Sequence, residues 1–386
     1  MTITRKLSII VMFMSLTYTP STYPCQHQFQ PDAANKKEQE NEKLDFNRGR
    51  FLPIPVFITE PALGEGLGVA LVYFHRVREN PKKLTLSSAD SLLLTKEHKV
   101  PPPTISGVFA GATNNETKVV GFGHINSFRE DRIRYTGVVV AADVNTKIYL
   151  TNLPVDFNLE GLIAYQDIKF RLGDSDWFLG AGLSYLDATN TFSLDLSKDV
   201  PGDIFSADIT NIGLAGKLLW DRRDTSSMPT KGQLFDVAIW RYDSAIGGDF
   251  SYWNANLKVH SFHSLHEKFV FGLRVDYSAT EGDAPFFAIP YVKMRGIPAL
   301  RYQGDRVASF EMELRYNLSP NWIVTVFSGI SSTDSDQLLI ERNNGIGAFG
   351  IGVRRKIFEA QNVWFGFDVA NGPEEAAWYI QVGHGW

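Results

Sequence analysis

Hydrophobic and polar residues alternate along most of the chain beyond residue 50, and this period of two predicts β-strands. The clearest example covers 309–318, where every even position is apolar and every odd position is polar or charged. Such a strand fits a soluble sandwich, whose apolar face packs on a core. It also fits a membrane barrel, whose apolar face meets lipid while its polar face lines a wet lumen. The alternation alone leaves both folds open.

Runs of this kind recur often enough to predict about 16 strands, the opening one following the segment 55–64. The run at 145–153 is the weakest of them. We expect the strands at 66–74, 104–113, 117–128, 131–143, 145–153, 156–172, 177–187, 208–221, 232–242, 251–263, 268–280, 307–318, 321–330, 346–357, 363–370 and 376–386.

The lengths of the connections distinguish the two folds. Bacterial outer-membrane barrels pair short periplasmic turns with longer outer loops, and no such segregation is required of a sandwich. In this strand count the two kinds of connection fall at opposite ends. We therefore expect an all-β, transmembrane, antiparallel barrel whose 281–306 loop lies outside. The short connections are 114–116, 173–176, 265–267 and 319–321, and the long ones are 77–103, 188–207, 281–306 and 331–345.

Composition agrees with a barrel. The chain is rich in aromatic residues and glycine, with 27 Phe, 14 Tyr, 8 Trp and 32 Gly. Beyond the N-terminus no apolar run reaches the roughly 20 residues of a spanning helix. A net charge of −5 argues against a nucleic-acid partner, and a single cysteine excludes an intrachain disulfide.

The N-terminal region predicts export. Residues 1–25 contain a short basic head, Arg5 and Lys6, followed by the apolar run 7–14, as in a signal peptide whose cleavage site is not fixed. Residues 26–50 are polar and charged and are expected to form a flexible periplasmic lead. The barrel domain is then expected at 51–386.

The segment Lys293-Met294-Arg295-Gly296-Ile297-Pro298, with Glu313-Leu314-Arg315-Tyr316 after it, resembles the BamA/TamA family of outer-membrane assembly and translocation barrels, or bacterial surface antigens. The resemblance implies that the loop folds back into the lumen. There Arg295, followed by Gly296, would meet Glu313. A second family carboxylate on the next strand has no counterpart at 325–329. Family members with an assembly role carry periplasmic polypeptide-transport-associated domains, which we expect this chain to lack.

A second segment resembles a periplasmic turn of the same family. It combines Asp221, Arg223 and Asp224 with Pro229, Lys231 and Gly232. A structural role is favoured over contact with a client protein, because Asp and Arg cross-pair at a barrel rim while Pro and Gly set the turn.

Two features of the last strands carry further expectations. Trp378, Ile380, Val382 and Trp386 share one face, and ending on an aromatic residue resembles the signal by which outer-membrane barrels are inserted. The same residues also suit an aromatic belt at the membrane boundary.

Glycines mark one face of the strand at 346–357. Gly350, Gly352 and Arg354 face the expected lumen. These glycines either leave space for the Arg295 loop to approach the wall or relieve curvature in the closed sheet.

The sequence contains no motif that indicates an enzyme. The chain has no Gly-x-Ser-x-Gly motif and no serine in a recognisable hydrolase setting, so we expect no enzyme and no cofactor. Three histidines, His260, His263 and His266, are not expected to bind a metal, because strand residues three apart point to opposite faces.

Three functions remain open for a barrel in the outer membrane of a Gram-negative bacterium. By resemblance, it assists insertion or transport of proteins or lipids, with outer-membrane lipids and a separate periplasmic accessory or client protein as partners. Alternatively, it is a passive pore plugged by its inward loop. In the third alternative, it is a surface interaction protein that acts through its long outer loops.

Overall fold

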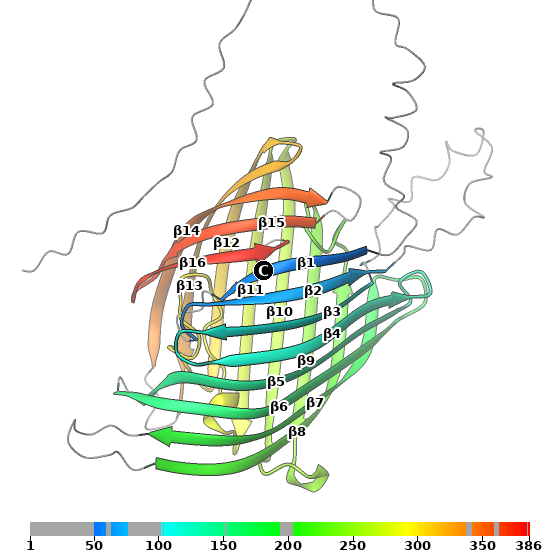
Figure 1. Ribbon diagram of the computed structural model, residues 1–386. Coiled ribbons are helices and arrows are strands. Elements are labelled where there is room, and N and C mark those ends of the chain that lie inside the picture. Colours follow the sequence, from blue (N-terminus) through cyan, green and yellow to red (C-terminus); the bar gives the residue numbers. More distant parts are fainter. Residues whose placement is uncertain are drawn as a thin grey trace, which may run out of the picture. The chain divides into compact units, whose positions relative to one another are not determined.

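Sixteen antiparallel strands, arranged in sequence order, form one sheet that curls into a nearly closed barrel (Figure 1). The predicted all-β antiparallel barrel is confirmed. The predicted signal peptide 1–25 and almost all of the lead 26–50 lie outside the described residues. The computed structural model describes residues 50–58, 63–75, 102, 104–150, 153–193, 204–336, 342–358, 363–383 and 385–386.

The strands differ in length around the barrel, from 7 residues in the last strand to 19 in the sixth. Their bounds are β1 (Arg50–Ile58), β2 (Gly66–Phe74), β3 (Ile105–Thr113), β4 (Lys118–Phe128), β5 (Ile133–Leu150), β6 (Leu153–Arg171), β7 (Trp177–Ser193), β8 (Ile204–Asp221), β9 (Gly232–Tyr242), β10 (Tyr252–His266), β11 (Phe269–Gly282), β12 (Arg306–Ser319), β13 (Trp322–Asp334), β14 (Asn343–Phe358), β15 (Val363–Asn371) and β16 (Ala376–Val382), with short 3-10 helices η3 (Ser244–Ile246) and η4 (Phe286–Ala288).

The predicted number of strands is right, but only because two errors cancel: one strand was missed and another was predicted as two. The chain forms a strand, β1, before the expected opening strand, and the expected strands 131–143 and 145–153 are one strand, β5. Pairing of β5 with β6 continues through Asn145. It does so because Asn158 donates hydrogen bonds to both Asp143 and Asn145 across the ladder, at 2.6 and 3.0 Å.

This difference changes the ends at which the first connections lie. With β5 unbroken, the turn 114–117 lies at the same end as the 283–305 loop, which the resemblance places outside. The connection between β2 and β3 lies at the opposite end, which the resemblance makes periplasmic and which also carries the turn 172–176. The predicted separation of long and short connections is therefore wrong for the first two and holds for 283–305.

The outer surface of the barrel is apolar. On β12, Met312 is 43% exposed on the outward face, whereas Glu311 and Glu313 on the inward face are 2% exposed. Around the barrel, Val120, Leu179 and Ile351 also expose apolar side chains on the outside. An apolar surface of this extent is favourable in contact with lipid and unfavourable in contact with water. The pattern is therefore that of a membrane barrel and not of a sandwich. Within the described residues, no helix combines the length and apolarity required to cross a membrane.

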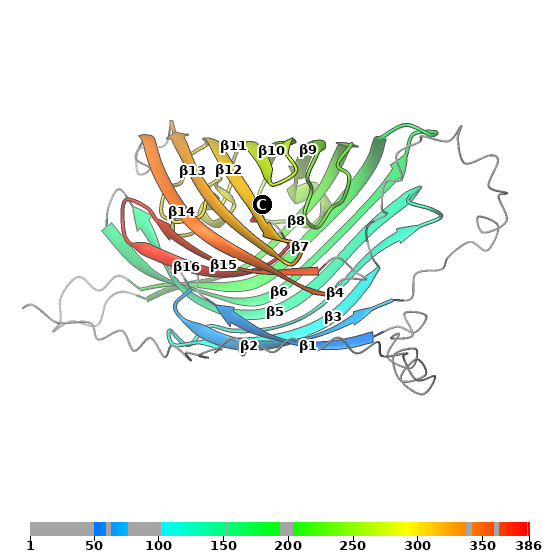
Figure 2. The same ribbon diagram turned by 90° about the horizontal axis from the view of Figure 1, so that it is seen from above.

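The loop between β11 and β12 folds into the barrel, as the resemblance implied. It enters with η4 and then packs its apolar side chains on the inner wall of β12 and β14. Figure 2, seen from above, shows this segment inside the ring of strands. The cluster comprises Val292, Met294, Ile297, Tyr302, Val307, Ile346 and Ala348.

The two ends of the sheet do not close on each other. β1 pairs with β2 and β16 pairs with β15, and no pairing joins β1 to β16 within the described part of the chain. Figure 2 shows the strands β15 and β16 set apart from β1 and β2. We call this junction the seam.

The outward face can be tested by placing a charge on it. Ile351 lies near the middle of β14 and is 55% exposed, so Ile351→Arg should lower the free energy of unfolding by about 2–4 kcal/mol. Ile357→Arg, on the same face near the strand end, should cost about 0–1 kcal/mol. Urea unfolding in lipid vesicles measures both, and equal costs would mean that this face does not lie in the bilayer.

A buried charge network in the lumen as the candidate site

The inward loop holds Arg295 against the barrel wall through its backbone. The amide of Gly296 donates a hydrogen bond to the Tyr379 hydroxyl on β16, at 2.9 Å. Gly296 has a φ of 90°, in the left-handed region that favours glycine. A Cβ at this position would also crowd Ala348 and Ala370 at 3.2 Å. The Arg-Gly pair is thus required by the conformation of the loop.

Arg295 binds three carboxylates at once. Its guanidinium lies 2.6 Å from Glu311, 2.9 Å from Glu313 and 3.0 Å from Asp368. Its Cζ also stands 3.5 Å from the ring centroid of Phe327. The structure therefore brings together Arg295 and Glu313, as the resemblance implied, and adds two acidic partners.

Asp368 on β15 was missed by sequence reasoning, which sought the second carboxylate on β13. The corresponding position of β13 offers the ring of Phe327 instead. A signal was present in the sequence, because Asp368 is the only charged residue in the run 363–371 and shares the inward face with Trp364 and Ala370.

Two further arginines complete the network. Arg315 donates to Glu313 at 2.6 Å, and Arg354 donates to Asp368 at 2.8 Å. The six side chains carry three positive and three negative charges, and none is more than 6% exposed. A buried charge is costly unless it is paired, so neutrality is a condition for this core to form. The set comprises Arg295, Glu311, Glu313, Arg315, Arg354 and Asp368, and we call it the lumen network.

Arg295 keeps its charge in this site. Burial by itself lowers the pKa of a guanidinium, but Glu313, Glu311 and Asp368 outweigh that effect and raise the pKa of Arg295 above its ordinary value. The cation is thus permanent, and the carboxylates around it remain paired.

The glycines of β14 make room for this network rather than for the loop. A Cβ at Gly352 would collide with the Asp368 carboxylate, and a Cβ at Gly350 would collide with the Phe327 ring. The loop itself approaches other glycines, because the Met294 sulfur lies against Gly329. We expected Gly350 and Gly352 to leave space for the loop. They leave space instead for Phe327 and Asp368, which are two partners of Arg295.

The turn motif between β8 and β9 is held by its own acidic residues. Asp221 accepts hydrogen bonds from Arg134 at 2.7 Å and Arg223 at 3.0 Å. Asp224 accepts from the backbone amides of Thr230 at 3.0 Å and Lys231 at 3.5 Å.

Gly232 ends the turn at a φ of 100°. A Cβ there would strike the Arg222 carbonyl, so only glycine fits this position.

This connection does not stay at the rim, contrary to expectation. Pro229 is fully buried, and its carbonyl accepts a hydrogen bond from Arg315 of the lumen network at 2.8 Å. Met228 packs on Ile323 and Trp364 from the inner wall. Segments from both ends of the barrel therefore meet on the same network, one through Arg295 and the other through Arg315.

The predicted C-terminal aromatic face divides in the structure. Trp378 remains on the outward face of β16, 36% exposed, with Ile380 two residues along, while the side chain of Val382 lies outside the description. Trp386 instead turns inward.

The Trp386 ring packs 5.6 Å from that of Phe262, and its indole N–H donates to Glu311. The expectation that it joins the lipid-facing belt is wrong. A buried indole needs an acceptor, and the carboxylate of Glu311 supplies one that lipid lacks.

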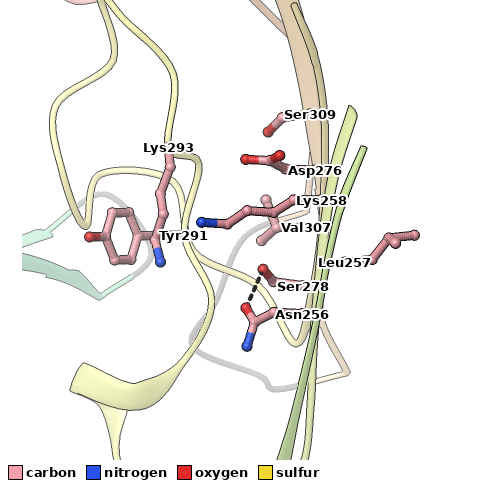
Figure 3. Close-up of a pocket in the computed structure, with 9 residues that line it drawn as sticks. All are labelled: Asn256, Leu257, Lys258, Asp276, Ser278, Tyr291, Lys293, Val307 and Ser309. Carbon is pink, nitrogen blue, oxygen red and sulfur yellow. Dashed lines mark hydrogen bonds between the residues drawn. The ribbon is translucent and has the colours of Figure 1, made fainter. Parts of the chain in front are cut away.

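Two cavities adjoin the inward loop. The smaller, about 30 Å³, lies between β10, β11 and the loop, where Figure 3 shows Lys258 reaching from the wall toward Tyr291 and Lys293. The larger, about 740 Å³, has Asn115, Asn158 and Thr191 among the residues that line it. Polar side chains thus face the loop in both cavities.

The histidines of β10 point to different sides. His260 is buried in the lumen beside Asp276, whereas His263 is exposed and bonds to Ser261 on the opposite face. Within the described residues, no cluster of three or more His, Cys, Asp or Glu side chains is placed to hold a metal ion.

Neutralising the central cation should unbalance the network. Arg295→Met should lower the free energy of unfolding by about 3–5 kcal/mol, because it leaves an uncompensated buried carboxylate. Arg301→Met on the same loop is the matched control. Arg301 pairs with the partly exposed Glu374 at 2.9 Å, so its loss should cost about 0–1 kcal/mol.

Adding Glu311→Gln to Arg295→Met should recover part of the lost stability, because it restores neutrality while keeping an acceptor for Trp386. Urea unfolding measures all three variants. Equal losses for Arg295→Met and Arg301→Met would contradict the network.

The two inward segments should be energetically coupled. Arg295 and Arg315 share Glu313, so a double-mutant cycle with Arg295→Met and Arg315→Met should give a coupling of about 0.5–3 kcal/mol. The control cycle pairs Arg295→Met with Arg134→Met, whose partners Asp131 and Asp221 are different. Additivity in both cycles would show that the segments are held independently.

Comparison with known proteins supports the fold. No family model matches the sequence, and no curated protein matches it. The structure is similar to BamA from Haemophilus ducreyi lacking POTRA domains 1-3, with a TM-score of 0.56 and 11% identity over 87% of this chain and 70% of that chain.

CdiB from Escherichia coli gives a TM-score of 0.56 and 11% identity over 86% of this chain and 62% of that chain. CdiB from Acinetobacter baumannii gives 0.53 and 10% over 86% and 59%. The chain thus spans less than two thirds of either CdiB chain. Its barrel has the outer-membrane fold of BamA and CdiB.

Proposed function

We propose that this protein resides in the outer membrane of a Gram-negative bacterium and assists the insertion or transport of proteins or lipids there. The motifs at 293–298 and 221–232, which resemble those of the BamA/TamA family, and the likeness of the barrel to BamA and CdiB support this class of function. The observation that carries the proposal is the unpaired seam between β1 and β16.

The sequence of β1 gives a physical reason for the seam. Pro53 and Pro55 lie two residues apart, so both belong to the same edge of the strand. Proline has no N–H, and within a sheet its nitrogen faces the free side of an edge strand. The edge of β1 that faces β16 therefore lacks two donors, which weakens closure of the barrel.

Unpaired strand edges provide a route for clients. Their free N–H and C=O groups form a template on which another extended segment can add. A lipid acyl chain can also pass between strands that are not joined by hydrogen bonds. In the proposal, the seam is where a client polypeptide or lipid meets the barrel.

The inward loop holds the hairpin on one side of this seam. Arg295 binds Asp368 on β15, and Gly296 binds Tyr379 on β16. Glu374 in the turn between these strands accepts a hydrogen bond from the Tyr302 hydroxyl, at 2.8 Å. Release of the loop would free β15 and β16 to move, so the lumen network acts as a latch on the seam.

The alternative is a passive pore that the two segments in its lumen plug. Single-channel recording separates the two functions: a plugged pore should conduct steadily once Arg295→Met loosens the loop. The proposed role needs no catalytic group. Its partners are outer-membrane lipids and a separate client or periplasmic accessory protein.

Sealing the seam should abolish the function. Replacement of both prolines, Pro53→Val with Pro55→Val, restores two donors at the free edge of β1 and should let it pair with β16. We expect higher stability, by about 0.5–1.5 kcal/mol for each hydrogen bond gained, and loss of activity. Leu52→Val on the same strand leaves the free edge unchanged and is the matched control.

Activity is measured by depleting the protein from its own cells and supplying each variant. Pulse-labelled outer-membrane barrels, lipoproteins and surface lipids are then quantified. The wild type and Leu52→Val should restore the class that falls on depletion, and the double proline variant should not. Full rescue by a sealed barrel would exclude the seam, and the absence of any fall on depletion would overturn the proposed role.

A further inference from the structure

A serine on the outward face of β3 lies between two histidines. The Ser106 hydroxyl oxygen is 2.7 Å from His75 Nε2 and 2.7 Å from His124 Nδ1. The three residues come from adjacent strands, because Ser106 pairs directly with His124 on β4, and His75 follows the last residue of β2. They are 31 and 18 residues apart in the sequence, so no local motif reveals them.

The strand register places this group on the lipid-facing side. Leu71, Val108 and Phe122 are paired across β2, β3 and β4, and all three are 42–50% exposed on the outside. Ser106 and His124 lie two residues farther along the same face. This is the periplasmic end of the strands, where Ser106 is the second residue of β3.

Neighbouring hydrogen bonds set the direction of the protons. Thr104 donates to Asn126 Oδ1 at 2.8 Å, which leaves the Asn126 amide to face His124 Nε2 at 3.4 Å. His124 Nε2 is then an acceptor, and its proton lies on Nδ1, directed at Ser106. The Ser106 hydroxyl therefore donates to His75 Nε2, which is the last acceptor in this series of hydrogen bonds.

Depth in the membrane indicates the substrate. The ends of barrel strands lie at the boundary between hydrocarbon and water, where aromatic side chains gather. Two rings mark this level: Tyr73 packs on His75, and Tyr135 packs on His124. The ester groups that join acyl chains to glycerol occupy the same boundary, so a lipid ester can reach Ser106 from the side.

We propose that Ser106 is the nucleophile and His75 the general base of an acyl-ester hydrolase acting on membrane phospholipids. The hydroxyl proton of Ser106 moves to His75 Nε2 while Oγ bonds to the ester carbonyl carbon. The bond from that carbon to the glycerol oxygen then breaks, and this oxygen takes the proton from His75 and leaves as a lysophospholipid.

Water completes the cycle. It attacks the acyl-serine and gives a proton to His75, which returns it to the departing Ser106 oxygen as a fatty acid is released. His124 acts as a positioning residue, because its Nδ1–H fixes the hydroxyl so that the proton points at His75. This activity is separate from the proposed transport role and departs from the sequence-based prediction that the chain is not an enzyme, which stays a prediction.

The test uses the full-length barrel in vesicles of phosphatidylethanolamine and phosphatidylglycerol. A fluorophosphonate probe should label the wild type, and the vesicles should accumulate lysophospholipid and fatty acid. Ser106→Ala should reduce labelling and hydrolysis to background. Ser261→Ala is the matched control, because Ser261 is an outward serine that contacts one histidine, His263, at 2.8 Å, and this variant should behave as wild type.

Substitution of the histidines separates their roles. His75→Gln should slow labelling by about 10²- to 10⁴-fold, because an amide cannot take the proton. His124→Gln, which can still donate to Ser106, should retain most of the rate, while His124→Phe should lose it. Heat-modifiable migration on a gel confirms that each variant is folded.

Each outcome decides the proposal. Labelling at Ser106 with lipid products supports it. A folded wild-type protein that resists the probe overturns the nucleophile, and labelling without lipid products overturns the substrate class. Retention of the full rate by His75→Gln would remove His75 as the base.

Discussion

The structure depends on charge neutrality in the barrel lumen. Six ionised groups, three of each sign, are removed from water beside one another, and such groups are tolerated only as a complete set. They come from four parts of the interior: Arg295 from the outer loop, Glu311, Glu313 and Arg315 from β12, Arg354 from β14, and Asp368 from β15. Because the periplasmic connection also binds Arg315 through Pro229, one network fixes the contents of the lumen from both ends.

The ion pairs in the lumen contribute more to stability than the backbone hydrogen bonds at the seam. Loss of one partner from a buried ion pair costs about 3–5 kcal/mol, whereas each net backbone hydrogen bond contributes about 0.5–1.5 kcal/mol. Pro53 and Pro55 remove donors from the edge strand β1, and the latch contacts of Gly296 and Arg295 fall on the hairpin across the seam. Motion should therefore begin at the seam, and the loop determines how far the hairpin follows.

Periodicity predicted the barrel well because lipid and lumen impose opposite polarities on neighbouring residues of a strand. It failed where cross-strand hydrogen bonds determine how far a strand extends. An example is Asn145, whose bond to Asn158 keeps β5 continuous. The resemblance predicted Arg295 with Glu313, but the partnership of Asp368 depends on the register of β14 and β15. Trp386 was misplaced because the alternation of β16 was extended beyond its last residue, where the chain turns to Glu311.

The outward polar side chains at the ends of β2, β3 and β4 lie where the hydrocarbon of the bilayer begins. Hydrocarbon supplies neither donors nor acceptors, so on that side these groups satisfy one another. Thr104, Asn126 and His124 do so in sequence, and the chain of bonds ends on Ser106 and His75. A relay that satisfies these groups also orients one hydroxyl proton toward one base. Since β2 pairs directly with β1, this chemistry lies one strand away from the seam, on the surface over which a laterally moving lipid would arrive.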